Sequence, residues 1–353
     1  MDTLAAAVAA HQAGDLDGAE RGYRNFPDRP TAWRNLGILC YSQGRLQEAE
    51  TAFRSALHLA PQHAPTRHGL SLALLAQGRY AEGWEAFEAR RDDPAGGTRP
   101  TTMPCPEWAG EPLQGKAIIV VGDQGFGDQI MFARLLPRLV ALGAEVVFLT
   151  DRATVPLFRA LPLRVVSALS RAEASAASCW TYLCSLPHRL GVTLETLPPP
   201  VDLKIATARG GGVGIVARGR PTHWNDGHRS LPPPAAARLL SMGRDLHPDA
   251  TGAADFRESA ELMASLDLVV SVDTSAAHLA ATMGKPTIVL LPRIGVDWRW
   301  RHSATTSPWY PSATLIHQGP DDDWSTALAA VEARVVTLAG QSGAGWRDSD
   351  DVR

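Results

Sequence analysis

The sequence has few cysteines and no excess of charge of either sign. Its 353 residues include four cysteines, whose spacings match neither a zinc nor a redox motif, so we expect free thiols in a reducing cytosol. The 34 basic and 37 acidic residues give a net charge of −3, without a Lys- or Arg-rich stripe. This balance argues against nucleic acid or an anionic membrane surface as the partner.

Long apolar runs and metal-ligand clusters are also missing. No run reaches the ~18 apolar residues that a membrane span needs. The N-terminal MDTLAAAVAA carries Asp2 and no basic residue, which is unlike a signal peptide. His223 and His228 are too isolated from other ligand types to predict a metal site. The sequence therefore predicts a cytoplasmic protein with no membrane span, no metal and no resident cofactor.

Three related stretches occupy the first ninety residues. They are GDLDGAERGY (14–23), GRLQEAETAF (44–53) and GRYAEGWEAF (78–87). The last two begin 34 residues apart, which is the tetratricopeptide period. In the middle copy, Gly37 and Ala49 are small enough for two antiparallel helices to approach closely, with Trp33 and Phe53 filling the space between them. Residues 1–93 therefore resemble a short tetratricopeptide array of about two and a half repeats.

Such an array offers a concave surface for a peptide or a protein partner. So short an array could instead cap the next domain or mediate homo-oligomer formation. The stretch that follows is rich in Pro, Gly and Thr, so we interpret residues 94–115 as a linker.

The next part of the chain reads as a parallel α/β domain over residues 116–200. A strand at 118–121 runs into GDQGFGDQ (122–129), a helical pattern follows, and the next strand covers 145–150. This order is typical of a right-handed βαβ unit. The glycine pattern is G-x-x-G-x-G rather than the dinucleotide G-x-G-x-x-G, so it gives little support to NAD binding.

A second α/β domain is expected over residues 201–318, after the proline-rich ETLPPP (195–200). We expect strands at 212–216, 266–272, 286–291 and 314–318, and helices at 230–240, capped by Ser230, and directly after Val272. A closing helix is expected within residues 319–340, and residues 341–353 read as a disordered tail. Two doubly wound halves joined by a hinge suggest a cleft that holds one reactant on each side.

The stretch SVDTSAAHLAA (271–281) places polar residues where the buried strand 266–272 passes into a helix. Ligands of parallel sheets bind at this edge, and the free amides of a helix N-terminus suit a phosphate. Thr274 and Ser275 add hydroxyl donors, His278 lies one turn further, and Asp273 suits sugar or ribose hydroxyls. The alternative is ordinary helix capping, with His278 as a packing residue.

The motif VDTSAAHLAATMGKP resembles the donor site of heptosyltransferase-like glycosyltransferases, which have the two-lobed GT-B fold. The chain is similar over nearly its whole length to bacterial tetratricopeptide proteins fused to such a transferase, and its architecture is also similar to protein O-GlcNAc transferases. The recurring motifs are RSLP (229–232), DF (255–256), LDLVVSVDTSAAHLA (266–280), GKP (284–286), DWRW (297–300) and SPWYP (307–311). The resemblance implies tetratricopeptide helices followed by two Rossmann-like domains.

The resemblance also assigns roles to individual residues. Asp128 matches the catalytic base, with Gly127 and Gln129 beside it on the acceptor side. Asp273, Thr274, Ser275 and His278 match contacts to the nucleotide sugar, and Arg229 falls near the basic residue that meets the diphosphate. ARGRP (217–221) departs from the more usual Ser-Gly-Asn type turn, so we expect Arg218 and Arg220 to supplement Arg229. The stretch between Leu240 and Phe256 looks too short for the usual strand and helix, which weakens the expectation of a nucleoside pocket.

The function that follows is inverting, metal-independent transfer of a sugar from a nucleotide-diphosphate donor to an acceptor hydroxyl, with a protein or peptide acceptor docked by the repeats. Two alternatives stay open: an inactive adaptor that still binds nucleotide sugar, and an enzyme that acts on a glycan or a lipid-linked glycan. The aromatic residues of DWRW and SPWYP either pack the C-terminal segment onto the lobes or stack on a sugar or base.

Overall fold

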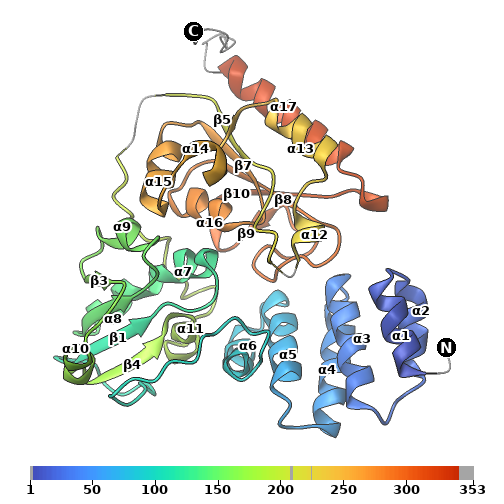
Figure 1. Cartoon of the computed structure of the whole chain (residues 1–353), viewed down its shortest axis with the longest axis horizontal. Coiled ribbons are helices and arrows are strands. Elements are labelled where there is room, and N and C mark those ends of the chain that lie inside the picture. The colour runs from blue at the N-terminus through green and yellow to red at the C-terminus, as the bar shows by residue number, and fades with distance from the viewer. Residues whose placement is uncertain (1–2, 207–209, 224, 342–353) are drawn as a thin grey trace.

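The computed structural model describes residues 3–206, 210–223 and 225–341, so the expected tail lies outside the described residues except for Gln341. Figure 1 shows three parts: a row of helix pairs in blue, a small sheet domain in green, and a larger sheet domain in yellow to red. The helical repeats and the two parallel α/β lobes that the sequence predicts are therefore confirmed. No helix of the described ranges is long and apolar enough to cross a bilayer.

The repeats form three antiparallel helix pairs. These are α1 (Leu4–Gln12) with α2 (Leu16–Arg24), α3 (Pro30–Ser42) with α4 (Leu46–Leu59), and α5 (Ala64–Ala76) with α6 (Tyr80–Phe87). Phe53 of α4 is buried between two glycines of the neighbouring helices. A Cβ atom at either Gly37 or Gly69 would lie 2.7 Å from its ring, so both helices approach Phe53 through bare backbone. Trp33 is half-buried at the edge of this contact.

Replacing Gly37 by alanine should destabilise the repeats by about 1–3 kcal/mol, the usual cost of overpacking a core. The new methyl group meets Cδ1 and Cε1 of the Phe53 ring, and Gly69 already lies against the adjoining Cε1 and Cζ atoms. Thermal unfolding followed by circular dichroism measures the effect. Gly227→Ala is the matched control, since a Cβ atom there meets nothing within 4 Å. Equal melting temperatures for the two variants would contradict the close approach.

The first lobe is a four-stranded parallel sheet in the order β3-β2-β1-β4. Its strands are β1 (Ala117–Val121), β2 (Glu145–Leu149), β3 (Arg164–Val166) and β4 (Cys179–Tyr182). Its helices are α7 (Phe126–Phe132), α8 (Leu136–Ala141), α9 (Val155–Phe158), α10 (Arg171–Ala176) and α11 (Leu186–Arg189). The strands expected at 118–121 and 145–150 are confirmed, whereas β3 and β4 were not predicted from the sequence.

The second lobe is a six-stranded sheet in the order β6-β5-β7-β8-β10-β9, parallel except for the edge strand β9. Its strands are β5 (Val213–Val216), β6 (Arg244–Asp245), β7 (Leu268–Val272), β8 (Thr287–Leu291), β9 (Thr306–Ser307) and β10 (Tyr310–His317). Its helices are α12 (Asp226–Arg229), α13 (Pro233–Leu240), α14 (Pro248–Thr251), α15 (Phe256–Ala264), α16 (Ser275–Thr282) and α17 (Ser325–Gln341). Helix α17 lies along α13 in Figure 1, where Arg238 pairs with Glu332 through two contacts of 2.8 Å.

Two local predictions for the second lobe need correction. Helix α13 begins at Pro233, not after a Ser230 cap, because the first turn is the one part of a helix that tolerates prolines. Ser230 instead accepts a hydrogen bond from the Gly219 amide and donates one to Asp226. The stretch after Leu240 does hold a strand and a helix, but each is reduced to a minimum: two residues in β6 and four in α14.

The repeats share a buried core with both lobes. Arg90, just after α6, is fully buried, and its guanidinium binds Asp123 of the first lobe at 2.9 Å. Trp84 of α6 donates to the Val192 carbonyl at 2.8 Å and packs edge-on against Trp298 of the second lobe, with ring centroids 5.4 Å apart. Helix α6 lies next to α11 in Figure 1. The array is thus built into the body of the two lobes rather than attached by a free linker.

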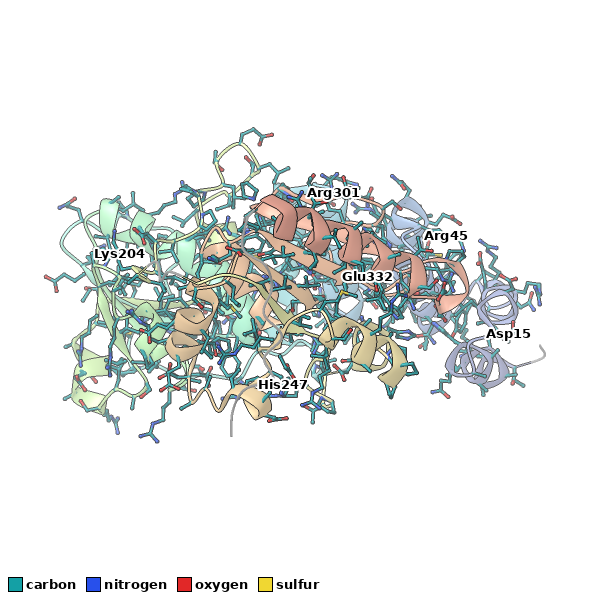
Figure 2. The ribbon with its side chains drawn as sticks, turned by 90° about the horizontal axis from the view of Figure 1, so that it is seen from above. Asp15, Arg45, Lys204, His247, Arg301 and Glu332 are labelled. Carbon is teal, nitrogen blue, oxygen red and sulfur yellow. The ribbon has the colours of Figure 1, made fainter. Side chains whose placement is uncertain are left out.

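The molecule is elongated in the view from above. In Figure 2, Asp15 lies at one end, in the repeats, and Lys204 lies toward the other, where the chain crosses between the lobes. Both tryptophans of DWRW are buried. Trp298, which packs against Trp84 where the repeats meet the lobes, is 2% exposed, and Trp300 is 0% exposed. Trp309 and Tyr310 are buried as well. The packing interpretation of these aromatic residues therefore fits the structure.

Candidate functional site

The N-terminal ends of two helices, one from each lobe, meet at the lobe boundary. Helix α7 carries Asp128, and α16 begins directly after Asp273 and Thr274. The two helices touch: a Cβ atom at Gly127 would lie 2.6 Å from Cδ2 of His278. Further contacts close the boundary, since the rings of Phe126 and Phe256 lie 5.0 Å apart. The structure therefore brings the expected base and the expected donor corner to one place.

Asp128 occupies the third position of α7. Its Oδ2 accepts a hydrogen bond from the Gly125 amide at 3.0 Å, and its Oδ1 pairs with the Arg299 guanidinium. Burial raises the pKa of this carboxyl above its ordinary value, the charge of Arg299 opposes that rise, and Asp297 adds to it. The side chain keeps 20% of its surface exposed, so an acceptor hydroxyl can reach it. A carboxylate with a raised pKa is better matched to proton abstraction near neutral pH than a free one.

Arg299 is a site residue that the sequence did not single out. Its Nη1 binds both oxygens of Asp297 at 2.8 Å, its guanidinium lies 4.5 Å from the centroid of the Trp298 ring, and 8% of its side chain is exposed. The only signal in the sequence was its place inside DWRW, which we interpreted through the tryptophans. The pairing with Asp128 depends on the opposite lobe and has no local pattern.

Asp273 is held at the carboxyl end of β7. Its Oδ1 accepts a hydrogen bond from the Trp300 indole at 2.8 Å, and its backbone carbonyl accepts one from Arg229 at 2.9 Å. Burial, with a smaller effect from the charge of Asp297, raises the pKa of Asp273 to about 6. The hydrogen bond from Trp300 and the charge of Arg229 act in the opposite direction. The molecule therefore keeps a partly desolvated carboxyl with a raised pKa at this corner.

This carboxyl predicts a pH dependence of stability. Its folded pKa of about 6 exceeds the unfolded value of about 3.9, so the folded state binds more protons between these values. The Asp273 contribution to stability is favourable at low pH and is lost as the pH rises through about 6. Melting temperatures at pH 5 and pH 8 should thus differ less in Asp273→Asn than in the wild type. Parallel pH profiles for the two proteins would contradict the assigned burial cost.

The start of α16 is partly accessible. Thr274 is its N-cap, yet its side chain makes no capping hydrogen bond and pairs with the Ser271 hydroxyl at 3.0 Å. The first amides of a helix have no acceptor within the helix itself. Asp273, Thr274 and Ser275 are half-buried rather than buried. Amides and hydroxyls at this corner are therefore available to a phosphate.

Comparison with known protein families matches three regions of the chain. Tetratricopeptide repeat models match residues 4–64 and 41–93, and glycosyltransferase family 9 (heptosyltransferase) matches residues 238–313. Residues 4–93 are thus similar to tetratricopeptide repeats, and residues 238–313 are similar to glycosyltransferase family 9. That region includes the α16 corner and Arg299 and excludes Asp128 and Arg229.

A curated relative and several solved structures resemble the chain. Protein FlbA of Caulobacter vibrioides is 33% identical over 154 residues, which cover 41% of this chain and 26% of FlbA, so the chain spans about a quarter of that relative. A family 9 glycosyl transferase from Veillonella parvula is 12% identical, covers 66% of this chain and 99% of its own, and has a TM-score of 0.43. An O-GlcNAc transferase mutant of Thermobaculum terrenum is 16% identical to this chain. The match covers 97% of this chain and 93% of the transferase chain, with a TM-score of 0.27.

His278 of the family 9 region is buried and paired. Its Nδ1 lies 2.9 Å from the Tyr310 hydroxyl, and its ring packs on Trp300 with centroids 5.0 Å apart. Burial keeps its pKa well below the ordinary value, so the ring is neutral at physiological pH. Its remaining edge faces Gly127, and the packing alternative for His278 describes this arrangement well.

The other expected site residues are spread around this corner. Arg229 is buried, with Nε bound to Asp226 at 3.2 Å. Arg218 is exposed and contacts Asp249 of α14 at 3.1 Å. Gln129 is buried, and its amide group is occupied by Thr150 and Asp151 of the first lobe. In this arrangement Arg229 lies at the corner, while the groups of Arg218 and Gln129 are engaged elsewhere.

The family 9 region and its neighbouring lobe hold no candidate metal cluster within the residues described: no group of three or more His, Cys, Asp or Glu side chains is arranged around a common point. Two hollows lie away from the corner. One, of about 440 Å³, lies along the interlobe segment 200–205 and the end of α16, and another, of about 380 Å³, lies between α6 and residues 193–195.

Proposed function

We propose that this protein is a glycosyltransferase that moves a sugar from a nucleoside-diphosphate donor to an acceptor hydroxyl. The observation that carries the proposal is the meeting of Asp128 with the partly accessible start of α16 across the lobe boundary. One side supplies a proton acceptor, and the other supplies amides, hydroxyls and the Arg229 guanidinium for a diphosphate. The family 9 match over 238–313 supports the donor half.

The reaction follows from these positions. The Asp128 carboxylate takes the proton of the acceptor hydroxyl while the acceptor oxygen bonds to the anomeric carbon. The bond from that carbon to the diphosphate oxygen breaks, and the nucleoside diphosphate leaves with the electron pair. Helix amides at Thr274 and Ser275, together with Arg229, stabilise the developing negative charge without reorganisation. A single displacement of this kind inverts the anomeric centre and needs no metal.

For the acceptor, we propose a saccharide hydroxyl, as the family description heptosyltransferase favours. The alternative of a protein acceptor docked on the repeats loses its main support, because the repeats already serve the fold through Arg90 and Trp84. Transfer of labelled sugar to saccharide and to protein fractions of a bacterial extract separates the two. Label in protein that disappears with Asp128→Asn would favour the protein acceptor.

Thermal-shift measurements with ADP, GDP and UDP test the donor site. A ligand at 100 times its Kd stabilises the folded state by about 2.7 kcal/mol. We expect one of the three to raise the melting temperature of the wild type and to have little effect on Arg229→Met. Arg238→Met is the control, since Arg238 binds Glu332 on α17. If no nucleoside diphosphate shifts the wild type, the proposed function is wrong.

A further inference from the structure

The segment Trp298–Arg299–Trp300 is anchored on two sides. Trp298 packs against Trp84 of the repeats and Trp309 of the second lobe, both at 5.4 Å between centroids. Trp300 packs on His278 and donates to Asp273. With both neighbours buried, Arg299 between them has little freedom. Its guanidinium is directed across the lobe boundary at Asp128.

The repeats hold the loop that carries this segment. The Gly295 amide donates to the Ser42 carbonyl at the end of α3, at 2.8 Å. Gly44, in the turn after α3, faces His302 so closely that a Cβ atom there would lie 2.7 Å from the imidazole ring. The loop is therefore clamped on both sides of Arg299 by the second helix pair of the array.

Arg299 is the cation that forms an ion pair with Asp128. Two carboxylates also act on Asp128, from Asp297 on the same loop and Asp123 in the turn before α7, and both favour its protonation. The Cys184 thiol lies nearby and is itself kept protonated by burial, which holds its pKa well above the ordinary value. His278 on α16 is neutral, as its burial dictates. Without Arg299, the hydrogen bond from the Gly125 amide would be left to oppose burial and the two carboxylates at Asp128.

We propose that Arg299 is a positioning residue for Asp128, supplied from the opposite lobe, which orients its carboxylate and places a positive charge against it. This inference rests on the proposed function of Asp128 as the base. One oxygen of Asp128 is fixed by Arg299 and the other by the Gly125 amide, so the carboxylate has one orientation. Each oxygen keeps a lone pair free for the acceptor proton. Because the repeats hold the loop that carries Arg299, they contribute to the chemistry even if they dock no acceptor.

The test is a direct titration of Asp128 by carbon-13 NMR of carboxyl-labelled aspartate, assigned with Asp128→Asn. In Arg299→Met the pKa of Asp128 should rise, whereas Arg299→Lys should stay close to the wild type because the charge is kept. The acid limb of kcat/KM should move to higher pH together with this pKa. For each unit by which the pKa of Asp128 rises, kcat/KM on the acid limb falls about tenfold, while kcat/KM on the alkaline side changes little. Arg293→Met, on the same loop but paired with Asp322, is the control and should change neither.

The outcomes are distinguishable. An unchanged Asp128 titration in Arg299→Met, with an active wild type, overturns this inference and leaves the proposed function standing. A shifted titration with no sugar transfer by the wild type overturns the proposed function and with it the catalytic part of the inference. If Arg299→Met does not fold, Arg299→Gln removes the charge and keeps hydrogen-bond donors, and the same comparison applies.

Discussion

Replacing Asp128 by asparagine is expected to lower kcat for sugar transfer by about 10²–10⁴-fold, the usual contribution of a general base. Asparagine has nearly the same shape and can still accept the Gly125 amide, so the start of α7 should keep its geometry. It cannot take a proton. Donor binding should remain, because the groups assigned to the diphosphate lie on the second lobe at α16 and Arg229.

Two measurements check this prediction. Initial rates give kcat, and titration calorimetry with the nucleoside diphosphate identified by thermal shift gives Kd. Asp92→Asn, at an exposed aspartate near the end of the repeats, is the matched control and should keep the wild-type rate. Full activity in Asp128→Asn would remove the base from the mechanism. If the wild type transfers no sugar, and Asp128→Asn binds the protein's partner as well as the wild type does, the adaptor alternative is favoured.

Deleting residues 1–93 is expected to prevent the rest of the chain from folding. The deletion removes Arg90, which leaves the carboxylate of Asp123 buried without its partner, a change that typically costs about 3–5 kcal/mol. It also removes Trp84 from the core shared with Trp298, and loss of a buried tryptophan costs about 3–5 kcal/mol on its own. These losses approach the whole stability of an ordinary domain. We expect the truncated chain in the insoluble fraction.

Smaller changes separate the two causes. Arg90→Met and Trp84→Ala should each lower the melting temperature strongly, measured by calorimetry. Deleting residues 1–28 is the control, since it removes only α1 and α2 and leaves both junction residues in place. A soluble, cooperatively melting chain that lacks residues 1–93 would contradict the shared core. Because the repeats and the lobes share this core, loss of activity on deleting residues 1–93 does not show that the repeats dock an acceptor.

The regular parts of the molecule were predictable from the sequence because their signals are local. The 34-residue period predicts the helix pairs, and apolar runs followed by glycine or polar turns predict β1, β2, β5, β7 and β8. Short strands such as β6 and β9 have only two residues each and carry no periodicity. Their pairing is decided by the neighbouring strands rather than by their own composition.

Only part of the candidate site was predictable from the sequence. The α16 corner was visible because strand end, hydroxyls and helix start are contiguous in the chain. The pairing of Arg299 with Asp128 joins residues 171 positions apart, and only the closed arrangement of the lobes brings them together. From the sequence, His278 could be either a ligand contact or a packing residue. Its burial against Trp300 and Tyr310 depends on the tertiary fold, which no local pattern reveals.

The junction of Trp84, Trp298 and Trp309 also gives the molecule an internal optical reporter. Indole emission depends on the polarity and packing around the ring, and these three rings come from the array and from two segments of the second lobe, against Phe132 of the first. A rotation of one part against another changes the surroundings of all three at once. A shift in the wavelength of their fluorescence would therefore report such a rotation in solution without any attached dye.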